Sequence, residues 1–324
     1  MNIFKRWLKF SLTLCILIVL FISVFNYKID SLGLFGNSTY LSKAAKSIVD
    51  GHMVAGLKNY DERLFQGLVI KKLKNRNDIV AIGSSRLMQL RKMHFRDENI
   101  NFYNNSVSGA SLEDFISIVG AYELIQGYIP STIIFGIDPW VFNKSSGQLR
   151  WKTLRKYYTY EVDKILKDES PTTNTLNLNK WKQLFNFDNT VNNVKFVLSK
   201  LKNNNKSFYV TNSVKIDDSI KETDGSIHYP YKLRYIDDID VKNSAVEFSK
   251  KNIYSLDNFN SLNNIDLFES FILYLKSKRV EIVIMLSPYH PISFDEINNN
   301  PKYKNVLNVG GIPDWEKNGG PMKK

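Results

Sequence analysis

Residues 78–86 read DIVAIGSSR, an apolar run that stops abruptly at a glycine and two serines. A short apolar run rich in Val and Ile, bounded by a turn of small residues, is typical of a buried parallel strand. The run 87–92 that follows is compatible with a helix. Ligands of open α/β sheets bind at the carboxyl ends of strands, where N–H groups of the turn and of the next helix also point. Ser85 is therefore a candidate nucleophile; alternatively, Ser84 and Ser85 only cap the next helix.

Strand-like and helix-like segments alternate on the C-terminal side of this run. The predicted elements are strands at 100–104, 132–137 and 280–286 and helices at 111–127 and 265–275. Ser111 and Asp114 form a capping box at the start of the first helix. Such alternation indicates an α/β fold with a doubly wound parallel sheet, in which all strands end at one edge. Ser85, the loop at Gly109 and the segment ending at Asp138 should therefore converge.

Two segments lack this alternation of strand-like and helix-like patterns. Residues 31–77 form a helical lead-in, with one helix predicted at 41–49 and a second that opens within 59–63, with Asn59 or Asp61 as its cap, and runs to about residue 73. Residues 145–262 are rich in Asn, Lys, Ser, Tyr and Asp, and we interpret them as a large insertion in an α/β domain of residues 78–324. No apolar pattern in the insertion is long enough for a separate sheet. Its candidates for lining a substrate cleft, with ordinary surface-loop composition as the alternative, are Asp224, His228, Tyr229 and Tyr231.

The N-terminus carries the clearest physical signal. Residues 10–27 are uncharged, and with Trp7 and Leu8 the apolar segment reaches about 20 residues, enough to cross a bilayer as a helix. Lys5, Arg6 and Lys9 precede or edge it. The positive-inside rule therefore predicts residues 1–30 as a cytoplasmic stub and transmembrane anchor, with residues 7–27 in the lipid bilayer. The following domain is then extracytoplasmic, either periplasmic or at the cell surface. A cleaved signal peptide is the alternative, but FNYK at 25–28 is no small-residue cleavage site.

The amino-acid composition bears on which classes of partner and ligand the protein binds. Lys and Arg number 44 against 32 Asp and Glu, a formal net charge of +12. An anionic partner such as acidic lipid, teichoic acid or acidic polysaccharide is one interpretation of this charge, and an ordinary solvated surface is the preferred one. The lysines are scattered among asparagines and no nucleic-acid motif occurs, so we predict no nucleic-acid partner. Cys15 is the single cysteine, which excludes an internal disulfide. No His-x-x-x-His spacing occurs, and the sequence predicts neither a metal site nor a cofactor.

Three short blocks at the strand ends resemble those of the Ser-Gly-Asn-His (SGNH, or GDSL-like) superfamily of hydrolases and acyltransferases. They are GSS at 83–85, NSVSG at 105–109 and GID at 136–138. The resemblance implies a flavodoxin-like, three-layer fold, Ser85 as the nucleophile and the Gly109 N–H as an oxyanion donor. Ser84 replaces the usual Asp, and Asp138 stands where the family has an oxyanion-hole Asn. A carboxylate there repels a developing oxyanion unless it is protonated or turned away.

The order of motifs resembles the membrane-anchored, extracytoplasmic branch of this superfamily, which includes the D-alanyl-lipoteichoic acid transfer protein and the alginate-acetylation proteins. The motifs after the anchor are DER at 61–63, GSSR at 83–86, GIDPW at 136–140, DGS at 224–226 and PYHP at 288–291. The resemblance implies an acyl-ester hydrolase or O-acyltransferase. Its implied partners are a cell-surface glycan or teichoic-acid-like acceptor and a membrane-bound O-acyltransferase.

A serine nucleophile needs a base within hydrogen-bond reach. His290 follows the strand 280–286 and is the last histidine of the chain. In the superfamily, acid and base come from an Asp-x-x-His block after a further strand, and residues 291–324 contain neither this block nor a clear terminal helix. Two interpretations stay open. Either His290 acts as the base, or the chain is truncated or frameshifted and Ser85 has none. The second corresponds to an inactive envelope protein that binds glycan or supports a membrane-bound acyltransferase.

Overall fold

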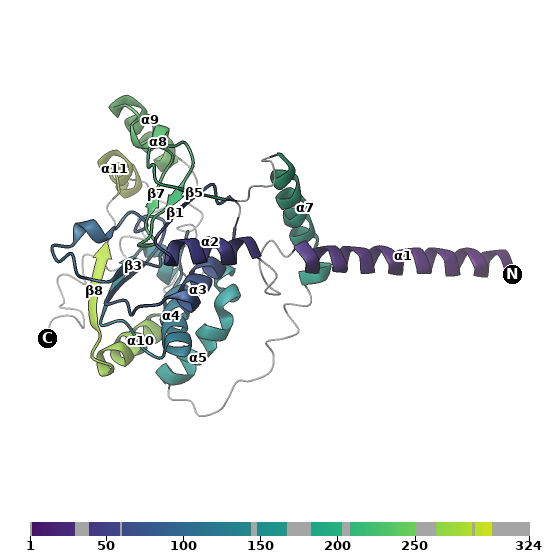
Figure 1. Ribbon diagram of the computed structural model, residues 1–324, viewed down its shortest axis with the longest axis horizontal. Coiled ribbons are helices and arrows are strands. Elements are labelled where there is room, and N and C mark those ends of the chain that lie inside the picture. Colours follow the sequence, from purple (N-terminus) through teal and green to yellow (C-terminus); the bar gives the residue numbers. More distant parts are fainter. Residues whose placement is uncertain are drawn as a thin grey trace.

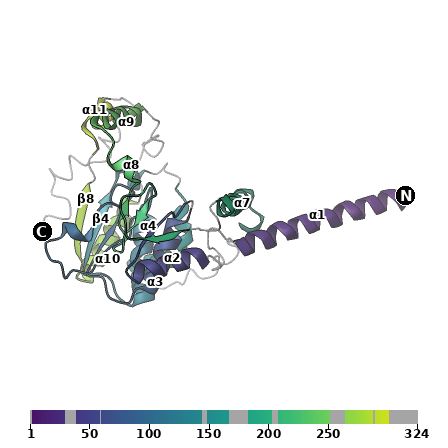
Figure 2. The ribbon, with the colours of Figure 1, turned by 45° about the horizontal axis from the view of Figure 1, so that its top comes forward.

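The computed structural model describes residues 2–29, 39–58, 60–143, 148–166, 183–202, 208–250, 264–286 and 289–299. A long N-terminal helix, α1 (Asn2–Ile29), projects away from an α/β body that contains all the described strands (Figures 1 and 2). Helix α7 (Phe187–Lys202) lies beside the end of α1 nearest the body. Of the motifs named above, Pro288 lies outside the described residues, as does the C-terminal segment 300–324.

Four parallel strands form the sheet of the body, in the order β3-β2-β4-β8. They are β3 (Phe102–Asn104), β2 (Ile79–Ile82), β4 (Thr132–Ile137) and β8 (Glu281–Leu286). The register pairs Ile79 with Phe102 on one side and with Thr132 on the other, and Thr132 with Glu281. The carboxyl ends of the strands therefore meet at one edge. The predictions of an α/β fold and of a parallel sheet are confirmed.

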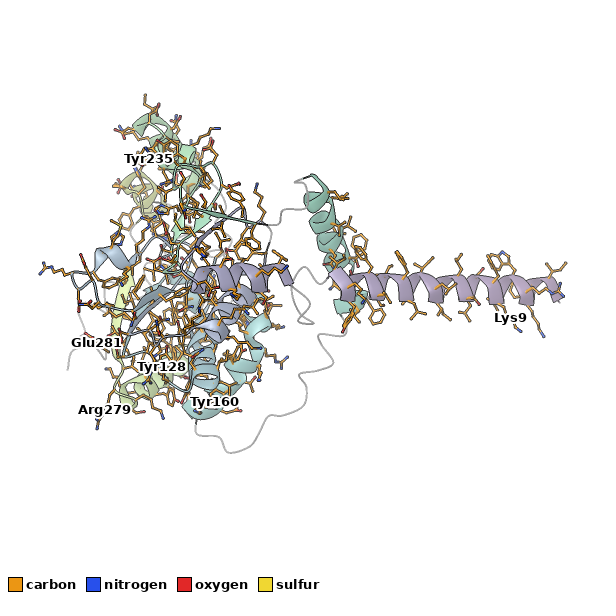
Figure 3. All side chains as sticks on the ribbon, in the orientation of Figure 1. Lys9, Tyr128, Tyr160, Tyr235, Arg279 and Glu281 are labelled. Atoms are coloured by element: carbon orange, nitrogen blue, oxygen red, sulfur yellow. The ribbon has the colours of Figure 1, made fainter. Side chains whose placement is uncertain are left out.

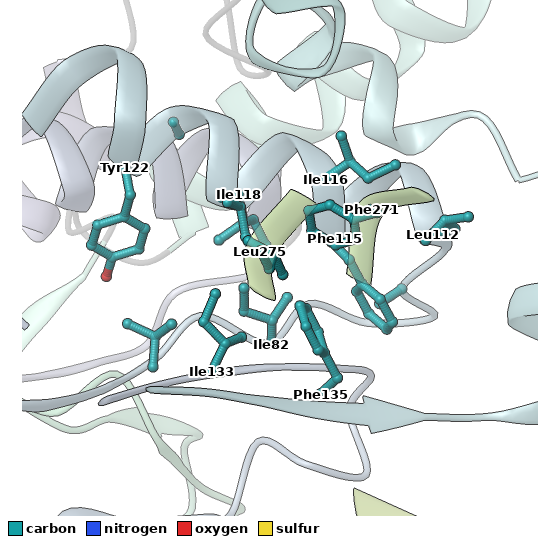
Figure 4. Close-up of a cluster of buried hydrophobic side chains, with 14 of the residues drawn as sticks. Ile82, Leu112, Phe115, Ile116, Ile118, Tyr122, Ile133, Phe135, Phe271 and Leu275 are labelled. Carbon is teal, nitrogen blue, oxygen red and sulfur yellow. The ribbon is translucent and has the colours of Figure 1, made fainter. Parts of the chain in front are cut away.

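One face of this sheet packs against helices (Figure 4). The packing helices include α4 (Leu112–Ala121), which continues as the π-helical turn η2 (Tyr122–Gln126), and α10 (Ile265–Ser277). Phe135 lies between them, with ring centroids 5.4 Å from Phe115 and 5.7 Å from Phe271. The predicted capping box starts α4, because the Ser111 N–H donates to the Asp114 carboxylate at 2.9 Å. Each fully buried aromatic or aliphatic side chain here contributes roughly 1.5–3 kcal/mol to stability.

A chain segment without an α-helix covers part of the opposite face. Leu87, Leu90 and Phe95 pack on Ala81 and Ile134 there. The predicted helix at 87–92 is wrong: residues 85–89 form turns, followed by the short 3-10 helix η1 (Lys92–His94). The physical reason is a contact distant in sequence, since the Asn104 amide donates to the Leu87 and Leu90 carbonyls at 2.9 and 3.0 Å. These two hydrogen bonds hold the segment beside β3 in its turn conformation.

A second, antiparallel sheet joins the lead-in to the insertion, in the order β5-β1-β6-β7. Its strands are β5 (Tyr209–Thr211), β1 (Met53–Ala55), β6 (Ile220–Lys221) and β7 (Ile227–His228). The prediction that the insertion forms no separate sheet is wrong. Strands of two or three residues are too short to show periodicity, and one of the four comes from outside the insertion.

Both predicted helices of the lead-in are confirmed, as α2 (Thr39–Val49) and α3 (Glu62–Lys72). Asp61 caps α3, since its carboxylate accepts the Leu64 N–H at 3.0 Å, whereas Asn59 lies outside the described residues. The other helices are η3 (Pro139–Phe142), η4 (Arg150–Leu154), α5 (Arg155–Leu166), η5 (Gln183–Phe185), α8 (Tyr231–Arg234), α9 (Asp238–Lys250) and α11 (Pro291–Asn299).

Helix α11 lies at the start of the segment 291–324, in which the sequence predicts no clear terminal helix, and the rest of that segment lies outside the described residues. Pro291 stands at its first position, where the fixed φ of proline favours helix initiation. The Ser293 hydroxyl donates to the Ala245 carbonyl of α9 at 2.9 Å, so α11 is held by a neighbouring helix. This support is distant in sequence, and the short segment shows little periodicity of its own.

Helix α1 is long and apolar enough to cross a membrane. Its side chains project freely along most of its length, with Lys9 toward the N-terminal end (Figure 3). A signal sequence near an N-terminus has the same length and composition. The predicted apolar N-terminal helix is confirmed.

Candidate functional site

Strand β2 ends in a tight turn that places Ser85 at the edge of the sheet. Gly83 is required there, because a Cβ atom at this position would lie 2.9 Å from Leu87 Cδ2 and 3.1 Å from the Gly136 Cα. The Leu87 N–H donates to the Ser84 carbonyl at 3.0 Å and closes the turn. No helix begins at this turn, so the expected N–H groups of a helix N-terminus are not present. Ser84 is buried, whereas Ser85 is half-buried.

The loop after β3 runs alongside the same turn. The Asn105 and Val107 N–H groups donate to the carbonyls of Ala81 and Gly83 at 2.7 and 2.9 Å. The Asn105 side chain accepts from the Tyr122 hydroxyl at 2.9 Å and donates to Gln66 at 3.1 Å. Buried polar groups are costly unless they are paired, so this satisfied network fixes the loop rigidly beside β2.

Two consecutive residues of the lead-in, Glu62 and Arg63, hold the next part of this loop. Asp61 caps α3, and the Glu62 carboxylate accepts both the N–H and the hydroxyl of Ser108, the latter at 2.9 Å. Arg63 forms two 2.9 Å hydrogen bonds with the Asp114 carboxylate and donates to the Ser108 carbonyl at 3.0 Å. The positioning role of Glu62 and Arg63 was missed by the sequence reasoning, because charges at a helix start give no sign of a partner about 45 residues away.

Gly109 occupies a backbone conformation that excludes other residues. Its φ is +54°, and an added Cβ would lie 2.5 Å from Arg150 Nη2. The Gly109 carbonyl accepts from the Gln148 side chain at 3.2 Å. Within the part of the chain that the structure describes, neither the Gly109 N–H nor the Ser85 N–H has a hydrogen-bond acceptor. The Gly109 N–H, predicted as an oxyanion donor, and the Ser85 N–H thus have no acceptor among the described residues, and Gly109 is not among the residues that line the cavity at Ser85.

Asp138 is buried at the end of β4 and faces Arg86. Its carboxylate lies 3.2 Å from Arg86 Nη1 and accepts a hydrogen bond from the Ser84 side chain. Burial raises the pKa of Asp138 above its ordinary value, opposed by the Ser84 hydrogen bond and the Arg86 charge. The carboxyl group is thus turned toward an arginine and holds the Ser84 turn.

His290 is exposed, and its Nδ1 accepts the Ile292 N–H at 3.3 Å. No hydrogen bond joins His290 to Ser85, although the structure describes both residues. The preceding residue does reach the site: the Tyr289 ring stacks on the Arg86 guanidinium at 3.8 Å. The structure therefore brings the chain after β8 to Arg86, but it does not form a Ser85–His290 dyad.

A cavity of about 210 Å³ opens at Ser85. The Tyr229 hydroxyl closes one side and donates to the Ser85 carbonyl at 3.4 Å. Lys221 is buried in the wall, with Nζ donating to the Gly225 carbonyl at 3.2 Å, and burial lowers its pKa. The lining residues come from the lead-in, the strand ends and the insertion, and they are Val54, Leu57, Tyr60, Glu62, Ser85, Met88, Ser108, Ser219, Ile220, Lys221, Ile227 and Tyr229.

The other cleft candidates of the insertion lie elsewhere. Asp224 and His228 line a second hollow of about 590 Å³ beside Arg91, while Tyr231 stacks on Tyr235. His228 Nε2 lies 2.6 Å from Glu222, and burial and the neighbouring Arg91 lower the pKa of the imidazole. Of the four candidates, only Tyr229 shares the cavity with Ser85. In the described ranges, no group of three or more His, Cys, Asp and Glu side chains is placed to hold a metal ion.

Comparisons of the chain with protein-family models, with curated proteins and with solved structures find no match. The geometry described above is therefore the basis for any functional interpretation.

Proposed function

We propose that the protein is a membrane-anchored, extracytoplasmic acyl-ester hydrolase or O-acyltransferase of SGNH type, with Ser85 as the nucleophile and cell-envelope polysaccharide as the acceptor. The observation that carries the proposal is the setting of Ser85. It ends a buried parallel strand, opens into a cavity of about 210 Å³, and its hydroxyl has no hydrogen-bond partner among the described residues. Ligands of open α/β sheets bind at this edge.

The chemistry follows from these groups. Ser85 Oγ attacks the carbonyl carbon of an acyl donor, its proton passes to the base, and the Ser85 and Gly109 N–H groups stabilise the oxyanion. The donor alcohol leaves with a proton from the base. Water or a polysaccharide hydroxyl then attacks the acyl-serine, and Ser85 regains its proton. His290 is our candidate base, and it would have to exchange its contact with Ile292 for one with Ser85.

The sheet order and the free donors agree with the flavodoxin-like SGNH fold that the motifs imply. Helix α1 would hold the domain at the cytoplasmic membrane with its N-terminus inside. The domain would then face acceptors such as teichoic acids and other surface glycans, with a membrane-bound O-acyltransferase as acyl source.

A second candidate function is binding without catalysis. It is favoured by the position of His290, which is exposed and bonded to Ile292, and by the pairing of Asp138 with Arg86. In this case the polar lining of the cavity, Glu62, Ser108 and Tyr229, would bind a glycan or assist a membrane-bound acyltransferase.

A fluorophosphonate probe separates the two functions, because it reacts with activated serines. We expect the full-length protein in detergent to be labelled, and Ser85→Ala and His290→Ala to lose the label. Ser219→Ala is the matched control, since Ser219 lines the same cavity away from the strand end and should keep the label. A folded wild type without label would overturn the catalytic proposal in favour of binding. Label retained by Ser85→Ala would exclude Ser85 as the nucleophile.

A further inference from the structure

Helix α7 carries an apolar stripe that no described part of the protein covers. Phe187, Val191, Val194, Leu198 and Leu201 recur at spacings of four and three residues, which places them on one side of the helix. Phe187, Val194, Leu198 and Leu201 expose 79, 42, 58 and 66% of their surface. A continuous exposed apolar patch of this kind marks an interaction surface.

The same helix is fixed to the C-terminal end of α1 through Asn26, which is fully buried. The Asn26 amide donates to the Leu184 carbonyl and the Thr190 hydroxyl, each at 2.8 Å. It accepts from the Asn193 side chain at 2.9 Å. Asn26 lies three residues before the end of α1, so at a rise of about 1.5 Å per residue the contact is within about 5 Å of that end.

This attachment sets the direction of α7. Figures 1 and 2 show α7 crossing the direction of α1 instead of continuing it. If α1 runs through a bilayer, α7 therefore lies along the membrane surface. Thr190 and Asn193 face the α1 contact, and the apolar stripe lies beside them on the helix. The sequence of α7 also contains three lysines and one aspartate, a balance that suits anionic headgroups.

We propose that α7 is an in-plane amphipathic helix whose stripe, Phe187 to Leu201, inserts into the lipid interface beside α1. Helices with an apolar side and basic residues lie in the headgroup region with the apolar side buried about 5–10 Å deep. The apolar surface of α1, where Phe21 and Val24 are exposed, ends next to this stripe, so one lipid layer can cover both. The inference rests on α1 lying in a bilayer and is independent of the chemistry at Ser85.

The test uses the full-length protein in vesicles of phosphatidylcholine and phosphatidylglycerol. Cys15 is the single cysteine, so a Cys15→Ser background accepts an environment-sensitive fluorophore at one chosen position. Val194→Cys and Leu198→Cys report on the stripe. Ile18→Cys in α1 is the lipid-embedded control, and Met93→Cys, an exposed apolar residue of the body, is the aqueous control. Quenching by lipids that carry a spin label at shallow or deep positions then measures depth.

We expect the labels at Val194 and Leu198 to shift their emission to the blue and to lose most of it to shallow spin-labelled lipid. Ile18 should respond to the deep label and Met93 to neither. Aqueous emission at Val194 and Leu198 would overturn the proposal. A blue shift without lipid quenching would also overturn it, because it would show that a second copy or another protein covers the stripe.

Discussion

Two arginine–aspartate pairs hold the loops around Ser85, and they differ in burial and in geometry. Arg63 and Asp114 expose 3 and 0% of their side chains and form two hydrogen bonds of 2.9 Å. Arg86 exposes 20%, and Asp138 3%, and the carboxylate lies 3.2 Å from Arg86 Nη1. The loop after β3 is therefore held by a buried, bidentate ion pair, whereas the ion pair at the turn after β2 is more exposed and adds to the backbone hydrogen bonds that close this turn.

The two ion pairs also differ in the groups that surround them. Arg63 also donates to the Ser108 carbonyl, so removing it frees a loop that lines the cavity. The Arg86 guanidinium instead stacks on the ring of Tyr289, the residue that directly precedes His290 in the sequence. The first pair therefore shapes the cavity, and the second links Ser84 and Asp138 to the chain that would supply the base.

The largest expected effect is at the buried, bidentate pair. Asp114→Asn leaves the Arg63 charge buried without its partner, and we expect it to lower the free energy of unfolding by about 3–5 kcal/mol. Thermal or urea unfolding of the full-length protein in detergent measures the loss. The matched control is Glu113→Gln, which removes the same charge from the same turn of α4 and should change stability by less than about 0.5 kcal/mol. Equal losses in both variants would contradict the difference in burial.

Arg86→Met should lower the free energy of unfolding by less, about 1–3 kcal/mol near neutral pH. This loss of stability should be smaller at acidic pH. The folded pKa of Asp138 is already raised by burial, and the Arg86 charge is one of the groups that lower it, so its removal raises this pKa further. A carboxyl group whose pKa is higher in the folded than in the unfolded protein stabilises the fold at low pH. This contribution is lost as the pH rises through the folded pKa. Unfolding measured across pH tests this prediction, and a penalty independent of pH would contradict it. Arg86→Lys, which keeps the charge, should restore most of the wild-type pH dependence.

Glu161 in α5 extends the comparison to a buried acid without an arginine. Its side chain is fully buried, and burial, then the neighbouring Glu123, raise its pKa to about 9. The folded protein thus keeps a proton that the unfolded chain loses near the ordinary glutamate pKa of 4.5, and the stability from this group falls as pH rises from 4.5 to about 9. Glu161→Gln should flatten the melting temperature across this window. An unchanged slope in Glu161→Gln would contradict the prediction, because it would show that the Glu161 carboxyl group is ionised in the folded protein.

Local patterns in the sequence predicted the elements that position Ser85. The apolar runs gave β2 and β4, and the Ser111–Asp114 capping box gave the start of α4. The helix predicted after Ser85 is wrong because Asn104, distant in sequence, donates to the carbonyls of Leu87 and Leu90 and holds this segment as turns. Propensity describes a segment alone and carries no information about such a contact.

The cavity itself was only partly predictable. Ser85 and Tyr229 were candidates from the sequence, whereas Glu62 and Lys221 were not predicted to line the cavity. Glu62 stands among the charges of a helix start, and Lys221 lies in a strand of two residues. Short antiparallel strands leave no periodic signal, and their pairing across the lead-in and the insertion is a tertiary effect. Asp138 and Arg86 both stand in the motifs, but the ion pair between them was not predicted.

The most direct test of the central claim is to locate the fluorophosphonate adduct on the wild-type protein by peptide mass spectrometry. Trypsin releases residues 77–86, which contain Ser84 and Ser85 and no other serine. We predict one adduct on this peptide, with fragment ions that assign it to Ser85 and not to the buried Ser84. A folded protein whose peptide 77–86 carries no adduct, or whose adduct lies on another serine, would contradict a nucleophilic Ser85.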